Sequence, residues 1–83
     1  MKLPVVSGEQ LIKILLKEGF IKKRQKGSHV TLEKKTDEKT YKTVIPLHGS
    51  LAKGTLNSIL KNTGLTKEDL LKLIVIIFGI NLK

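Results

Sequence analysis

The 83-residue chain contains no cysteine, so a disulfide framework and thiolate zinc sites are excluded. Its stability must therefore come from the packing of apolar side chains. A chain of this length buries roughly 60% of the surface that its unfolded form exposes, which leaves room for one small core. We expect a single domain over residues 1 to 83.

Aromatic residues are also scarce, because Phe20, Tyr41 and Phe78 are the only three. This argues against a platform of the RRM or OB type, on which nucleic-acid bases stack. No apolar run reaches the ~20 residues that a membrane-spanning helix needs. The N-terminal MKLPVV lacks the pattern of a signal peptide, since Pro4 breaks its short apolar run. The sequence thus predicts a cytoplasmic protein with no membrane partner.

Acidic residues are few, with seven Asp and Glu against sixteen Lys and Arg, and the formal net charge is +9. Six cations lie between residues 20 and 35, with Glu33 as the one acidic residue among them: Lys22, Lys23, Arg24, Lys26, Lys34 and Lys35. Clustered cations are typical of a surface that binds nucleic acid or another polyanion. A lysine-rich surface that serves only solubility is the alternative, and charge alone does not decide between them.

The first third of the chain predicts a helix followed by a strand. Ser7 and Gln10 form a capping box, and the apolar spacing after them predicts a helix over about 8–18. Gly19 is placed to end this helix. Residues 20–25 then have the composition of a strand.

A turn at residues 26–28 predicts that this strand continues into a hairpin, because its glycine can adopt a positive φ. In the strand after the turn, Val30 and Leu32 alternate with His29 and Thr31. If the apolar pair faces the core, the histidine lies on the other face. We therefore expect His29 to be accessible.

The second half of the chain predicts one more strand and two helices. The strand covers residues 41–46, limited by its proline, although its alternation is too short to assign a buried face. Helical spacing and a following glycine predict a helix over about 54–63, and Thr66 with Asp69 opens another. The apolar run IVIIFGINLK, at 74–83, is compatible with a core helix, a strand, or an exposed segment that contacts a partner or a second copy of the chain.

The predicted order of helix, three strands, helix and helix indicates an α+β fold. Consecutive hairpins favour a three-stranded antiparallel sheet with the helices packed on one face. The open face of that sheet would carry His29 and Thr31 beside the cationic first strand. A polyanion could lie there.

The stretch RQKGSHV, at residues 24–30, is the candidate for chemistry, because it places a histidine behind a turn and among cations. Histidine is the one side chain whose unperturbed pKa lies near neutrality, so it can act as a general base. Neighbouring cations can stabilise the charge that develops on an attacked phosphate, and no metal or cofactor is needed for this chemistry. The alternative is an ordinary hairpin histidine at the surface.

Three consecutive blocks of the sequence resemble the HicA-type mRNA interferase toxins: SGEQLIKILLKEGF, RQKGSHV and IPLHGSLAKGTLNSILKNTGLTKEDLL. The resemblance covers about residues 5 to 74. It implies a fold like that of a double-stranded-RNA-binding domain, cleavage of RNA, and neutralisation by a HicB antitoxin that covers the active site. The single catalytic histidine of that family falls on His29.

The expected phosphate contacts are cations of the first strand: Lys22, Lys23, Arg24 and Lys26. Strand alternation lets only some of them share a face with His29. Gly27 permits the turn and a close approach of the RNA backbone, while Ser28 either caps the turn or donates a hydrogen bond to a phosphate. His48 is an auxiliary candidate, because a ribonuclease with two histidines would use it as the acid. Its position near the start of a helix is more often that of a loop anchor.

These features together predict a metal-independent endoribonuclease, the toxin of a toxin–antitoxin pair. The alternative is a noncatalytic double-stranded-RNA-binding module that keeps the fold and the basic face. Such a module has no need of a histidine at position 29, so that residue discriminates between the two hypotheses. The sequence argues against DNA binding, because no helix concentrates the basic residues that would enter a major groove.

Overall fold

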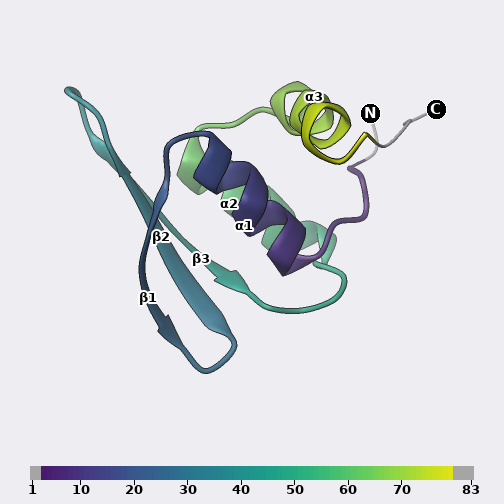
Figure 1. Cartoon of the computed structure of the whole chain (residues 1–83), viewed down its shortest axis with the longest axis horizontal. Helices are drawn as coiled ribbons and strands as arrows, with labels where there is room; N and C mark the ends of the chain where they lie inside the picture. The colour runs from purple at the N-terminus through teal and green to yellow at the C-terminus, as the bar shows by residue number, and fades with distance from the viewer. Residues whose placement is uncertain (1–2, 80–83) are drawn as a thin grey trace.

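The computed structural model describes residues 3–79 of the chain, as three helices and three strands. In chain order these are α1 (Gly8–Lys17), β1 (Ile21–Lys26), β2 (His29–Lys35), β3 (Thr40–Pro46), α2 (Lys53–Thr63) and α3 (Lys67–Phe78). The strands form one antiparallel sheet in the order β1-β2-β3. Helices α1 and α2 lie on one side of this sheet, and α3 packs against α1 (Figure 1). The predicted α+β fold is confirmed.

Helix α1 begins where the sequence predicts, because its capping box is formed. The Ser7 hydroxyl accepts the Gln10 backbone N–H at 3.1 Å, and the Gln10 side chain accepts the Ser7 backbone N–H at 2.9 Å. These bonds satisfy N–H groups that have no partner within the helix. The helix ends one residue earlier than expected, since Glu18 is its C-cap and Gly19 follows with a φ of 96°.

The hairpin between β1 and β2 is closed by a two-residue turn, because Lys26 pairs with His29. Gly27 adopts a φ of 59°, whereas Ser28 does not have a positive φ. A positive φ at the first central residue is the pattern of a type II′ turn, which matches the twist of the strands it joins. Strand β1 is shifted by one residue from the expected 20–25, because Phe20 is buried in the core instead of pairing in the ladder.

The core lies between the sheet and the helices. Its largest fully buried side chains come from all three helices and from β2 and β3: Leu11, Ile14, Leu15, Leu32, Ile45, Leu56, Leu70 and Ile74. Val30 is buried together with Leu32, as the alternation in β2 predicts. The opposite face of β2 therefore points away from the helices.

Helices α2 and α3 are separated by a glycine and a second capping box. Gly64 ends α2 in the left-handed conformation, with a φ of 76°. The Thr66 backbone N–H donates to the Asp69 carboxylate at 3.0 Å, and this bond lowers the pKa of Asp69 from its ordinary value. Because the ionised carboxylate is the stabilised form, the box weakens as the pH falls through that lowered pKa.

The C-terminal apolar run is helical as far as Phe78, where α3 ends, so the prediction of a strand is wrong for this part of the run. Leu70 and Ile74 are buried in the core, while Val75 and Ile76 are 46% and 75% exposed. The segment is therefore both a core helix and an exposed apolar surface. Its last residues, 80–83, lie outside the described part of the chain. Within residues 3–79, no helix is long and apolar enough to span a membrane.

Candidate functional site

The strand register assigns each side chain of the sheet to one of two faces, because residues paired directly across strands share a face. Val30, Leu32 and Ile45 face the helices. The other face, which we call the open face, carries three cross-strand rows: Lys26–His29–Pro46, Arg24–Thr31–Val44 and Ile21–Glu33–Lys42. The candidate site is built on the first two of these rows.

His29 is the first residue of β2, and its side chain is exposed, as the sequence predicts. Its direct neighbours on the open face are Lys26 of β1 and Pro46 of β3. The ladder continues one step beyond Pro46, because the Leu47 N–H donates to the Ser28 carbonyl at 2.6 Å. The backbone on both sides of His29 is thus held by hydrogen bonds, while its ring remains open to a ligand.

A β-bulge in β1 decides which of the expected cations share a face with His29. The register shifts between Lys22 and Arg24, and Lys23 has no partner in the pairing. Arg24 stays in alternation with Lys26 and pairs with Thr31 on the open face, whereas the bulge moves Lys22 to the helix side, where it pairs with Leu32. Without the bulge, alternation would place Lys22 and Arg24 on the same face.

One side-chain hydrogen bond supports this sorting of the β1 side chains. The Lys22 ammonium donates to the Gln25 side chain at 2.8 Å, and Gln25 pairs with Val30 on the helix side. The structure thus brings Arg24 and Lys26 together with His29, and it does not bring Lys22 to that face.

The remaining cations of the basic run are divided in the same way. Lys34 pairs with Tyr41 on the helix side, and its ammonium lies 5.9 Å from the centre of the Phe20 ring. Lys35 belongs to the open face by alternation, as does Lys42 of β3. Sequence reasoning missed Lys42 and its neighbour Val44, because the alternation in β3 is too short to assign its faces.

The two turn residues next to His29 are exposed. Open space surrounds the position that a Cβ at Gly27 would occupy, so a ligand backbone can approach the turn closely. The Gln25 side chain donates to the Gly27 carbonyl at 3.1 Å and braces the turn. The Ser28 hydroxyl lies at the same end of the sheet, where it can donate to a bound anion.

His48 lies in the loop between β3 and α2, beyond the last paired residue of the sheet. Its side chain is exposed, and its backbone carbonyl accepts the Gly8 N–H at 2.9 Å. This bond satisfies the first N–H of α1, so the backbone of His48 anchors the loop. The register does not place His48 in a row with His29.

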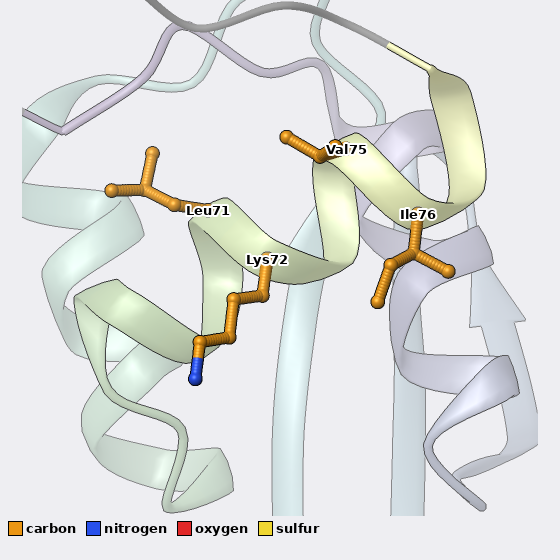
Figure 2. Close-up of a pocket in the computed structure, with 4 residues that line it drawn as sticks. All are labelled: Leu71, Lys72, Val75 and Ile76. Atoms are coloured by element: carbon orange, nitrogen blue, oxygen red, sulfur yellow. The ribbon is translucent and has the colours of Figure 1, made fainter.

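The outer side of α3 carries an open hollow of about 370 Å³, lined by Leu71, Lys72, Val75 and Ile76 (Figure 2). We call its three apolar members, Leu71, Val75 and Ile76, the α3 surface. These residues belong to the helix layer, so the hollow is separate from the open face. Within residues 3–79, no three His, Asp or Glu side chains are grouped as a metal site would need.

Comparison with known proteins assigns the chain to a family. A family model described as the HicA toxin of bacterial toxin–antitoxin systems matches residues 8–65. The match is shorter than the resemblance seen in the sequence, and it leaves α3 outside. No curated protein and no solved structure matches the chain. Because the family match covers more than half of the chain, including every residue of the candidate site, the chain belongs to the HicA family of toxins of bacterial toxin–antitoxin systems.

Proposed function

We propose that this toxin acts in the cytoplasm by cleaving mRNA, with His29 as the general base. The observation that carries the proposal is the open face itself, on which an exposed histidine has Lys26 as its direct neighbour and Arg24 in the next row. The formal charge of +9 favours a polyanionic substrate. Membership of a toxin family explains why such a reactive face would be controlled by a partner.

The expected chemistry is transesterification within one phosphodiester. The His29 ring accepts the proton of a ribose 2′-OH, and O2′ attacks the adjacent phosphorus. The bond from phosphorus to O5′ of the next nucleotide breaks, and this oxygen takes a proton from solvent. Directly paired residues have Cβ atoms about 5 Å apart, so the Lys26 ammonium can reach the same phosphodiester and stabilise its added charge. The step needs neither metal nor cofactor.

We propose a HicB-type antitoxin as the protein partner of the open face. Arg24, Lys26 and Lys42 share this face with Glu33 as its one acidic residue, so an acidic partner surface would be complementary to it. Charge complementarity speeds association, and a protein seated there would exclude RNA from His29. A noncatalytic RNA-binding module would need no such control.

Expression in bacteria that lack the antitoxin tests the proposed function. The wild-type chain should stop growth and fragment cellular mRNA within minutes of induction, whereas a folded His29→Ala variant should do neither. Co-expression of the antitoxin should restore growth. A wild-type chain that accumulates without harm, or a His29→Ala variant that is equally toxic, would refute the proposal.

The α3 surface provides a second prediction, because it is apolar, two of its three residues are exposed, and it lies outside the family match. Ile76 is 75% exposed, so Ile76→Glu should leave folding and RNA cleavage unchanged. If the antitoxin extends its contact onto α3, this variant should weaken antitoxin binding about tenfold or more, since it places a charge against apolar surface. Titration calorimetry with purified antitoxin measures the effect.

A matched control for this variant is Ser58→Glu, which adds the same charge to an exposed polar position of α2. Substitution is cleaner than truncation after Ile74, because Ile77 and Phe78 pack against the core. Unchanged antitoxin affinity together with a lower molar mass in light scattering would assign the α3 surface to self-association instead. Unchanged affinity with an unchanged mass would leave it as part of the fold only.

A further inference from the structure

The row next to His29 on the open face combines a cation, a small polar residue and an apolar residue. Arg24 of β1 is exposed, Thr31 of β2 is 9% exposed, and Val44 of β3 is 46% exposed. The two rows are separated by two residues along each strand, which is about 7 Å. A ligand held at His29 therefore reaches this row as well.

Arg24 is the only arginine among the sixteen cations of the chain. A guanidinium presents a planar fork of donors that can bind two phosphate oxygens at once, which a lysine ammonium does not. Arg24 lies two residues before Lys26, which pairs with His29, so regular alternation places its side chain on the face of His29. The one residue suited to bidentate phosphate binding is thus next to the candidate base.

Val44 is an exposed apolar side chain in the same row of the open face as Arg24 and Thr31, whereas the other exposed large apolar residue of this face, Ile21, lies in the Glu33 row, farther from His29. Pro46, which is half-buried, lies on the same face two residues along β3, so Val44 and Pro46 form a short apolar strip beside His29 and Thr31. An apolar strip beside a phosphate-binding group matches the two ends of a nucleotide, whose base has an apolar face and whose phosphate is charged. Arg24 and Val44 lie on the outer strands, about 10 Å apart at the backbone, so they can contact the two ends of one nucleotide together.

We propose that Arg24, Val44 and Pro46 form a subsite for one unpaired nucleotide of the RNA, adjacent to the bond at His29. Arg24 binds the phosphate of this nucleotide, and Val44 with Pro46 contacts the face of its base. The nucleotide must be unpaired, because the faces of bases within a duplex are covered by their stacked neighbours. The subsite rests on the proposed function, and it deepens that function by making the chain selective for single-stranded RNA.

Binding and cleavage of one RNA oligonucleotide, either single-stranded or annealed to its complement, test this subsite. Arg24→Gln should weaken binding of the single strand to the full-length chain about tenfold or more, which is the value of a lost charged hydrogen bond. Arg24→Lys should recover part of the loss, because it keeps the charge but not the fork. Val44→Ser should weaken the single strand about threefold to tenfold through lost apolar contact, and it should leave duplex binding unchanged.

Lys61→Gln is the matched charge control, because Lys61 is exposed on α2 in the helix layer. Equal losses in Arg24→Gln and Lys61→Gln would overturn the subsite and leave only diffuse attraction between charges. A Val44→Ser variant that binds RNA normally but loses antitoxin affinity would assign the strip to protein contact. With either of these outcomes, the proposed function stands as long as the wild-type chain cuts RNA. A wild-type chain that neither binds nor cuts RNA would refute the proposed function together with the subsite.

Discussion

Replacing His29 by alanine is expected to lower the single-turnover rate of RNA cleavage by about 100-fold to 10,000-fold, the contribution of a positioned general base. The fold should survive, because the ring is exposed and the backbone at this position is held by its neighbours in the ladder. Circular dichroism and urea unfolding check the fold of the variant. RNA affinity should change little, since the phosphate contacts come from Arg24 and Lys26.

His48→Ala is the control for this substitution, because it removes the only other histidine of the chain. The structural role of His48 is carried by its backbone carbonyl, which alanine retains. We therefore expect this variant to keep most of the wild-type rate. A large loss in His48→Ala would make His48 the general acid, and an undiminished rate in folded His29→Ala would remove His29 from the mechanism.

Gly8→Ala is expected to be strongly destabilising, because it fills the contact between α1 and the end of β3. A Cβ at this buried position would overlap the Pro46 carbonyl oxygen and lie 3.2 Å from the Leu47 Cα. Both obstacles belong to the backbone, so the first turn of α1 must move. We expect a loss of about 3 kcal/mol in the free energy of unfolding, measured in urea. Since Pro46 pairs with His29, the shift should also disturb the open face.

Gly54→Ala is expected to be stabilising, although Gly54, like Gly8, lies in the first turn of a helix. Gly54 lies in the first turn of α2, and open space surrounds its Cβ position. Neither Gly8 nor Gly54 has a positive φ, so alanine fits the backbone at both positions. Gly54→Ala should therefore stabilise the chain by about 0.5–1 kcal/mol through helix propensity. If Gly8→Ala and Gly54→Ala have the same free energy of unfolding, the close packing of α1 against Pro46 does not contribute to stability.

Much of the fold could be predicted from the sequence because local signals and tertiary packing agree in it. The capping boxes at Ser7 and Thr66 and the glycine ends of the helices are local, so they mark the helix boundaries to within about two residues. The exposure of His29 could be predicted from the alternation of β2, because the apolar residues Val30 and Leu32 identify the buried face and His29 lies on the other one. These features need no knowledge of distant residues.

The sorting of the cations could not be predicted, because it depends on the bulge at Lys23. A bulge inserts one residue against the partner strand, so its position is fixed by pairing with β2 and not by the sequence of β1. Simple alternation would put Lys22 on the face of Arg24 and Lys26. The place of Val44 could not be predicted for a similar reason. Each face of β3 carries both polar and apolar residues, so the sequence pattern does not show which face is buried.

The C-terminal apolar run illustrates a second limit. Residues such as Val75 and Ile76 favour strands by propensity, yet they are helical here because Leu70 and Ile74 pack into the core at helical spacing. Packing against α1 overrides the local preference. Exposure of Ile76 is a consequence of that spacing, and it could be found only once the buried side of α3 was known.

The most direct test of the central claim is to incubate the purified wild-type chain with single-stranded RNA in EDTA and to analyse the ends of the products by mass spectrometry. The proposed mechanism predicts fragments that end in a 2′,3′-cyclic phosphate, and no cut at a bond whose 2′-OH has been replaced by hydrogen. Cleavage that stops in EDTA, or that continues at the 2′-deoxy position, would contradict a general base acting from the open face.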